Sequence, residues 1–173
     1  QNHYIFNTYH VAKSETTKTN ITDYEVVWPY IEMERFANIN HDPEKHRYIA
    51  FIGRFTKEKG LDIFLQICHA MPEQQFLVIG GTLKELEDFM KKNDDQNRTP
   101  KNLSIEPFTK EIEKLYQFIK IVVFPTRNES FGRVAIEASL AQIPVVATGL
   151  IGVKEATNFH SNYIEQADLT NIE

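Results

Sequence analysis

From Tyr48 onward, short apolar runs alternate with segments of helical spacing, and this alternation constrains the fold more than any other feature. The runs are almost continuously apolar, which is typical of strands buried on both faces. The apolar runs are Tyr48–Ile52, Phe76–Ile79, Leu103–Ile105, Ile121–Phe124 and Val145–Ala147, with a further short strand expected around Tyr163-Ile164. The helical segments are Leu61–Met71, Leu83–Lys92, Lys110–Phe118 and Arg133–Ala141. The sequence therefore predicts an α/β fold, a Rossmann-like parallel sheet with helices on both faces.

The first part of the chain has a different character. Residues 1–46 are polar, rich in Thr and Asn, and interrupted by prolines at Trp28-Pro29 and Asp42-Pro43. Because the residue before a proline is disfavoured in a helix, these positions predict breaks in regular structure. We expect residues 1–46 to hold a remnant of an N-terminal domain and a linker. The Rossmann-like domain is expected over residues 47–173, truncated at its C-terminal end.

Composition excludes several classes of function. The formal net charge of −5 disfavours broad nucleic-acid binding, which needs a positive surface field, so no nucleic-acid partner is expected. Cys68 is the single cysteine, and its apolar neighbours predict a thiol packed in the core. No apolar run is long enough to span a bilayer, and the first residues do not resemble a signal peptide. We expect a cytoplasmic protein, with peripheral association of the full-length protein at the cytoplasmic face of a membrane as an alternative.

Two clusters of polar residues follow predicted strands, at the edge where parallel sheets bind their ligands. The first cluster runs from Gly53 to Gly60 and contains Arg54 and Lys59. Guanidinium and ammonium groups bind phosphate oxygens, and glycine permits close approach of the backbone to a ligand. The same residues would also suit a solvated basic turn, and this cluster alone does not decide between the two interpretations.

The second cluster follows the strand predicted at Ile121–Phe124 and leads into the next helix. Amides exposed at the start of that helix suit a diphosphate. These amides are those of Gly132, Arg133 and Val134. Glu129 and Glu137 suit hydroxyl groups of a sugar or ribose, because a carboxylate accepts two hydrogen bonds from a diol. The alternative makes Glu129 a charge that complements the helix dipole and Glu137 a solvated helix position.

The two clusters together resemble the donor site of the retaining group 1 glycosyltransferases of GT-B architecture. Glu129 and Glu137 are separated by seven residues, as in the Glu-x7-Glu signature of that family. Gly53-Arg54 followed by Lys59-Gly60 resembles the family's other donor-site motif. Three further segments resemble the interdomain link and the closing pattern: Val26-Val27-Trp28-Pro29-Tyr30 through Arg35-Phe36, Ile143-Pro144-Val145-Val146-Ala147, and Gly152-Val153-Lys154-Glu155. The resemblance runs from about Glu25 to Glu165.

This resemblance implies a donor-binding domain of an enzyme that transfers a sugar from a nucleotide-diphosphate sugar with retention of configuration. It assigns Arg54 and Lys59 to the departing diphosphate, Glu129 to the transferred sugar and Glu137 to the ribose hydroxyls. The other implied donor-binding positions are Gly53, Gly80, Phe108, Ser130, Phe131, Gly132, Arg133 and Val134. No metal and no cofactor is implied, since cations and helix amides supply the positive charge. The acceptor, a glycan, lipid or other molecule, would be bound by the N-terminal domain.

The sequence departs from the family pattern, and two other classes of function stay open. Ser130 and Arg133 replace the commoner Gly and Leu, and Arg133 would either add a phosphate contact or point to solvent. Gln142-Ile143 stands where a glycine usually precedes the proline, so we expect that turn to differ. The alternatives are a noncatalytic Rossmann-like module that binds protein, because fold alone does not determine function, and a nucleotide-sugar epimerase of related architecture. A glycoside hydrolase is disfavoured, because hydroxyl recognition explains both glutamates better.

Overall fold

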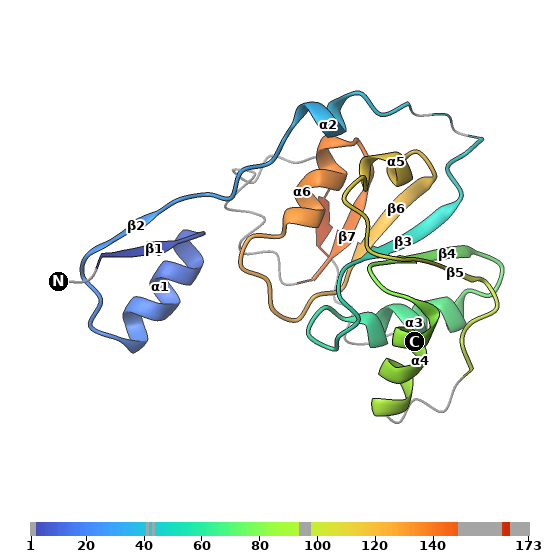
Figure 1. The fold of residues 1–173 in the computed structure, drawn as a ribbon, viewed down its shortest axis with the longest axis horizontal. Helices are drawn as coiled ribbons and strands as arrows, with labels where there is room; N and C mark the ends of the chain where they lie inside the picture. Colours follow the sequence, from blue (N-terminus) through green and yellow to red (C-terminus); the bar gives the residue numbers. More distant parts are fainter. Residues whose placement is uncertain (1–2, 41, 43, 94–97, 149–163, 167–173) are drawn as a thin grey trace.

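A six-stranded parallel sheet forms the centre of the molecule, shown as a computed structural model in Figure 1. The structure describes residues 3–40, 42, 44–93, 98–148 and 164–166. The strands are β3 (Tyr48–Ile52), β4 (Gln75–Ile79), β5 (Leu103–Glu106), β6 (Ile119–Phe124), β7 (Val145–Ala147) and β8 (Ile164–Gln166). Their order in the sheet is β5-β4-β3-β6-β7-β8, and every neighbouring pair is parallel. This is the strand order of the Rossmann fold, in which direction along the sheet reverses at β3 and β6.

Helices cover both faces of this sheet, as the sequence predicts (Figure 1). One face packs against α3 (Leu61–Ala70) and α4 (Leu83–Lys92), and the other against α2 (Glu34–Ala37), α5 (Glu113–Tyr116) and α6 (Arg133–Leu140). Successive residues of β3 alternate between two separate cores. Ile49 and Phe51 pack with Phe64 of α3, while Ala50 packs with Ala135 of α6. Both faces of the strand are therefore buried, which explains its continuous apolar run.

Two predicted boundaries are wrong, each for a local reason. The helix expected over Lys110–Phe118 is only α5, Glu113–Tyr116, because residues 107–112 form an irregular loop in which Thr109 Oγ1 accepts a hydrogen bond from the Glu111 amide at 3.0 Å. Strand β6 begins at Ile119, two residues before the apolar run expected at Ile121–Phe124. Lys120 separates Ile119 from that run, but its Nζ donates to Gln74 Oε1 at 2.6 Å, so the charge does not prevent strand pairing.

The N-terminal segment forms a small β-α-β unit beside the sheet domain (Figure 1). It consists of β1 (Tyr4–Phe6), α1 (Tyr9–Lys18) and β2 (Tyr24–Val26), and the two strands pair in parallel. Thr8 caps α1, since its Oγ1 accepts a hydrogen bond from the Val11 amide at 3.2 Å. The segment is thus more regular than the remnant expected from its polar composition, because α1 carries few apolar residues to reveal its period. The division at residues 46 and 47 stays a prediction.

The turn after α6 keeps the geometry of a glycine turn without the glycine. Gln142 has φ of 56°, in the left-handed region. The amide of Gln142 donates to the Ser139 carbonyl at 3.0 Å, and that of Ile143 donates to the Ala138 carbonyl at 2.9 Å. These two bonds define a Schellman motif, which usually carries glycine at this position. The backbone here therefore follows the usual glycine turn, and the expectation that this turn would differ is wrong.

The structure also bears on the predictions for Cys68, for membrane-spanning segments and for the last strand. Cys68 is fully buried in the core, as predicted, and burial raises the pKa of its thiol to about 12. Within the described ranges, no helix is both long and apolar enough to cross a bilayer. Tyr163 and the Gly152-Val153-Lys154-Glu155 segment lie outside the described residues, but the strand expected beside Tyr163 is confirmed at Ile164–Gln166.

Candidate functional site

The loops after β3 and β6 meet at the point where the strand order reverses. Gly60 makes this approach possible. Gly60 is the N-cap of α3 and has φ of 79°, and a Cβ there would lie 1.9 Å from the Pro125 carbonyl oxygen. No other residue type fits both the backbone angle and the space. The glycine predicted to open this helix is therefore needed to bring the two site loops into contact.

Arg127 joins the same two loops. Its guanidinium donates to both carboxylate oxygens of Asp62, at 2.7 and 2.8 Å, and to the Lys57 carbonyl. Its backbone amide donates to the Glu58 carbonyl at 2.8 Å. A two-pronged arginine–carboxylate pair fixes orientation as well as distance. The loop 125–132 is thus held against the loop 53–60 before any ligand binds.

Lys59 and Glu129, predicted to meet a diphosphate and a sugar, are bound to each other. Lys59 Nζ lies 2.8 Å from Glu129 Oε2, with side chains 21% and 14% exposed. Burial raises the pKa of the Glu129 carboxyl, but the hydrogen bonds from Lys59 and from the Gly132 and Phe131 amides outweigh it, so the pKa is lowered. Glu129 is therefore a carboxylate at neutral pH, with one oxygen on Lys59 and the other on the Phe131 amide at 3.2 Å.

Helix α6 begins at the site with an open N-terminus. Its N-cap is Gly132, which has φ of 77° and no side chain to cap the first amides. Uncapped amides at a helix start bind anions, because they carry partial positive charge and lack intrahelical partners. The amides of Arg133 and Val134 follow directly. The Gly132 amide, also predicted to meet the diphosphate, donates instead to Glu129, and anion binding by the Arg133 and Val134 amides stays a prediction.

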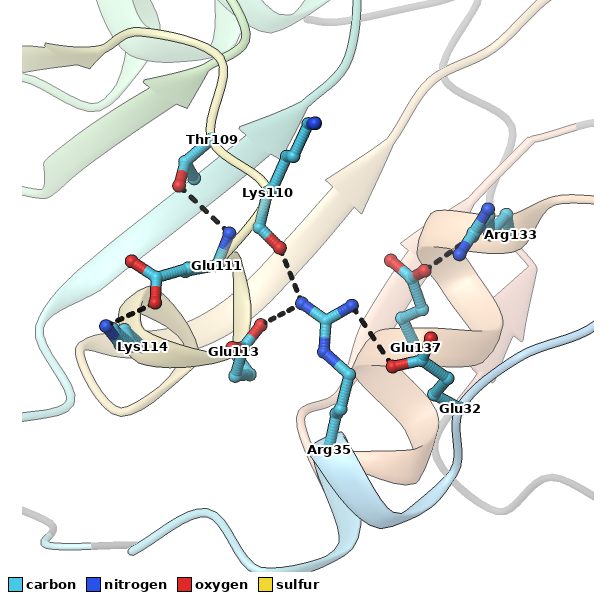
Figure 2. A network of polar contacts seen from close by, with 9 residues as sticks. All are labelled: Glu32, Arg35, Thr109, Lys110, Glu111, Glu113, Lys114, Arg133 and Glu137. Carbon is cyan, nitrogen blue, oxygen red and sulfur yellow. Dashed lines mark hydrogen bonds and ion pairs between the residues drawn. The ribbon is translucent and has the colours of Figure 1, made fainter.

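Glu137 lies one turn inside α6 and is only 7% exposed, so the alternative of a solvated helix position is wrong. Arg133 Nε donates to Glu137 Oε1 at 2.7 Å, as Figure 2 shows. Arg133 therefore does not simply point to solvent, although 59% of its side chain is exposed. This arrangement presents a carboxylate and a guanidinium together, which suits a ligand that carries both hydroxyls and phosphate.

A pocket of about 510 Å³ gathers many of the predicted residues. From the predicted set it is lined by Gly53, Arg54, Gly80, Phe108, Arg133, Val134 and Glu137. Gly80 is required by a close approach, since a Cβ there would lie 2.3 Å from the Gly53 carbonyl oxygen. The pocket lies at the carboxyl ends of β3, β4 and β5, where Rossmann-like sheets bind nucleotides. Its size is typical of a small-molecule site.

The remaining predicted residues are not among those that line this pocket. They are Lys59, Glu129, Ser130, Phe131 and Gly132. Two of them instead contact the N-terminal segment. Ser130 Oγ accepts a hydrogen bond from Asn7 Nδ2 at 3.0 Å, and the ring of Phe131 lies 6.1 Å from that of Trp28. The loop 128–132 therefore forms the junction between the N-terminal segment and the pocket.

Sequence reasoning missed two cationic residues of the pocket, Arg35 and Lys110. Arg35 belongs to α2, which precedes the sheet domain, and Lys110 was assigned to a helix. The only signal for Arg35 was its place in the segment that resembles the interdomain link. With Arg54 and Arg133, these residues give the pocket four cationic side chains against the carboxylate of Glu137. Such a balance favours an anionic ligand.

A second pocket, of about 560 Å³, lies between the loop after β3 and α4. It shares Arg54 and Gly80 with the first pocket, but it is also lined by Glu85 and Asp88. These acidic side chains oppose its cations, so the first pocket is the better candidate for a phosphate ester. Among the residues described, no group of three or more His, Cys, Asp or Glu side chains is arranged to hold a metal ion.

Fold and site together define a Rossmann-like domain with a pocket rich in cationic side chains at its strand-order reversal. The family model of the glycosyl transferases group 1 matches residues 32–164. The chain therefore belongs to that family, which confirms the resemblance seen in its motifs.

Curated relatives agree with this assignment. The chain is 27% identical over 145 residues to the D-inositol 3-phosphate glycosyltransferase of Mycolicibacterium smegmatis, covering 76% of this chain and 33% of the relative. It is 32% identical over 130 residues to the enzyme of that name from Corynebacterium urealyticum, covering 66% and 30%. The chain thus spans about a third of the length of these relatives.

Solved structures share the fold. The glycosyltransferase WaaG, involved in lipopolysaccharide biosynthesis, superposes with a TM-score of 0.72 at 16% identity, over 94% of this chain and 48% of WaaG. Anabaena HepE, in complex with UDP and glucose, superposes with a TM-score of 0.68 at 18% identity, over 94% of this chain and 48% of HepE. The architecture is that of the Rossmann-like domain of GT-B glycosyltransferases.

Proposed function

We propose that this chain is the donor-binding part of a glycosyltransferase that uses a nucleoside-diphosphate sugar and retains the configuration of the transferred sugar. One observation carries the proposal: a single pocket holds the cations Arg54 and Arg133, the buried carboxylate of Glu137 and the exposed ring of Phe108. These groups complement a diphosphate, a ribose and a base. The solved structure of HepE, which holds UDP and glucose, supports the choice of donor.

The proposed mechanism breaks the bond between the anomeric carbon and the phosphate oxygen. The electron pair stays on the leaving phosphate, so negative charge grows there while the acceptor oxygen bonds to the anomeric carbon on the same face and its proton passes to the leaving phosphate. Arg54 and the first amides of α6 would stabilise that charge, which lowers the barrier more than it aids binding of the intact donor. Lys59, held by Glu129 in the ligand-free chain, would turn to the diphosphate as the sugar hydroxyls engage Glu129.

Metal-free chemistry is part of the proposal. The pocket supplies positive charge from arginine side chains and helix amides, so the diphosphate needs no bridging cation. The acceptor and its binding site would belong to the rest of the full-length protein, as would any contact with a membrane. We also propose a cytoplasmic location, where nucleotide sugars are available. The noncatalytic module and the epimerase gain no support from the relatives above, which are glycosyltransferases.

Isothermal titration calorimetry of the chain with UDP, GDP and ADP tests the donor site. We expect one nucleoside diphosphate to bind, and its nucleoside to bind more weakly because it lacks the charged groups. Glu137→Gln and Arg54→Met should each weaken binding by roughly ten- to a hundredfold, the range for hydrogen bonds to charged groups. Lys114→Met is the control, since it removes an exposed ion pair with Glu111 outside the pocket.

Two outcomes would contradict the proposal. The first is a folded chain that binds none of these nucleotides at millimolar concentration. The second is binding that Glu137→Gln and Arg54→Met leave as strong as the control. Retention is tested separately on the full-length enzyme, by NMR assignment of the anomeric configuration of donor and product.

A further inference from the structure

The wall of the donor pocket that carries Phe108 is an irregular loop. Residues 107–112 connect β5 to α5 without regular secondary structure, and four of them line the pocket: Phe108, Thr109, Lys110 and Ile112. Phe108 is 75% exposed, so packing does not hold it. The loop's described side-chain hydrogen bonds to itself are local, as between Thr109 and the Glu111 amide. A wall of this kind needs an anchor from another element if it is to keep one shape.

Arg35 supplies such an anchor from a distant part of the sequence. Its Nη2 donates to the Lys110 carbonyl oxygen at 2.5 Å and to Glu113 Oε2 at 2.5 Å. Nη1 lies 3.6 Å from Glu32 Oε2 on its own segment. Figure 2 shows the guanidinium of Arg35 reaching from α2 to both ends of the turn that leads into α5. One guanidinium nitrogen thus bridges a backbone carbonyl of the loop and a carboxylate of α5.

The base of Arg35 is itself fixed. The next residue, Phe36, is 2% exposed and packs edge-on against Tyr116 of α5, with ring centroids 5.9 Å apart. The same phenylalanine belongs to the core that includes Ala135 and Ala138 of α6. Helix α2 is therefore held between α5 and α6, and the arginine extends from a rigid position. Arg35 is 33% exposed and Glu113 23%, so water competes only partly for these hydrogen bonds.

We propose that Arg35 is a positioning residue of the donor pocket, which holds the loop 107–112 in the shape that selects the nucleobase. The inference rests on the proposed function in one respect, the identity of the ligand. Arg35 would act through the loop and Phe108, not by binding phosphate, because both acceptors of its Nη2 are protein groups. Helix α2, which precedes β3 in the sequence, and the loop 107–112, which follows it, would thereby together determine which nucleobase the pocket accepts.

The first test needs no ligand. Amide hydrogen exchange is measured on the whole chain and on three variants: Arg35→Met, which keeps the aliphatic stem, Arg35→Lys, which keeps the charge, and the control Lys18→Met, which removes an exposed ion pair with Glu15 on α1. We expect exchange of the hydrogen-bonded amides of Glu111, Lys114 and Leu115, at the end of the loop and the start of α5, to accelerate roughly tenfold or more in Arg35→Met, as for loss of a charge-assisted hydrogen bond. Arg35→Lys should recover part of the protection, while α4 and the control should not change. Unchanged exchange of the Glu111, Lys114 and Leu115 amides in both Arg35 variants would overturn the role of Arg35.

The second test separates positioning from direct binding. Affinities for UDP, GDP, ADP and inorganic pyrophosphate are compared across the same variants. If Arg35 positions the loop, Arg35→Met should reduce the ratio between the affinities of the tightest-binding and weakest-binding nucleotides. The affinity for pyrophosphate should stay the same. An equal loss for all four ligands would overturn it in favour of a phosphate contact. If the unmodified chain binds no nucleotide, the proposed function fails, whereas hydrogen exchange still decides whether Arg35 fixes the loop.

Discussion

Replacing Lys59 by methionine tests whether the ion pair with Glu129 stabilises the two loops of the site. Methionine keeps much of the aliphatic stem but removes the charge, which leaves the Glu129 carboxylate, 14% exposed, without its cation. Losing one partner costs about 3–5 kcal/mol in a fully buried pair and about 0–1 kcal/mol in an exposed one. This pair lies between those limits, so we expect the free energy of unfolding to fall by about 2 kcal/mol at pH 7.

The same substitution has a definite pH dependence. The pKa of Glu129 is lowered in the folded chain, where the hydrogen bond from Lys59 and the backbone amides outweigh burial. A lowered pKa contributes stability that is complete above the unfolded value, about 4.3, and is lost as the pH falls through the folded pKa. Without Lys59, the pKa of Glu129 rises relative to the wild type, because only the Gly132 and Phe131 amides then oppose the effect of burial. The destabilisation by Lys59→Met should therefore be largest at neutral pH and shrink as the pH falls below about 4.

Urea denaturation of the wild type, Lys59→Met, Glu129→Gln and the double variant measures this coupling. A double-mutant cycle should give an interaction energy of about 1–2 kcal/mol at pH 7 and less at pH 4. Lys114→Met serves as the control, because its partner Glu111 is exposed and such pairs contribute little. A loss below about 0.5 kcal/mol for Lys59→Met, or additive single variants, would refute the reasoning.

Three further predictions concern the scaffold. Gly60→Ala should lower the unfolding free energy by about 2–4 kcal/mol, because φ is 79° and the new Cβ would lie 1.9 Å from the Pro125 carbonyl oxygen; a melting temperature equal to wild type in calorimetry would contradict this. Gln142→Gly should stabilise the chain by about 1 kcal/mol, since it removes a left-handed side-chain residue; a lower urea midpoint would show otherwise. Cys68, buried and with its pKa raised to about 12, should react with a thiol reagent at pH 8 only after unfolding; rapid labelling of the native chain would rule this out.

The sheet could be predicted from sequence because its strands are buried on both faces. Strand β3 has the continuous apolar pattern that this environment requires, and the loop after it starts with Gly53-Arg54, which enters the pocket as expected. The Glu-x7-Glu spacing placed Glu137 on α6 with similar success, since helical periodicity is local. Features that depend on residues close together in the sequence could therefore be predicted from it.

Contacts between segments that are distant in the sequence could not be predicted from it. Arg35 meets Lys110 and Glu113 across 75 and 78 residues, and no local pattern indicates such a pair. The direct bond between Lys59 and Glu129 also depends on how two loops approach, although each residue was singled out. The extent of α5 was wrong for a related reason. Residues 110–112 follow a helical apolar pattern, but their loop is held by Arg35 and by local turns instead.

The central claim is that a nucleoside diphosphate binds in the pocket of Arg54, Arg133 and Glu137. Two-dimensional 1H–15N NMR of the labelled chain, titrated with the nucleoside diphosphate that binds best, tests it directly. We predict that chemical-shift changes concentrate at 53–54, 108–112 and 132–137. Changes confined to the neighbouring pocket at 85–93, or no saturable change anywhere, would contradict the account.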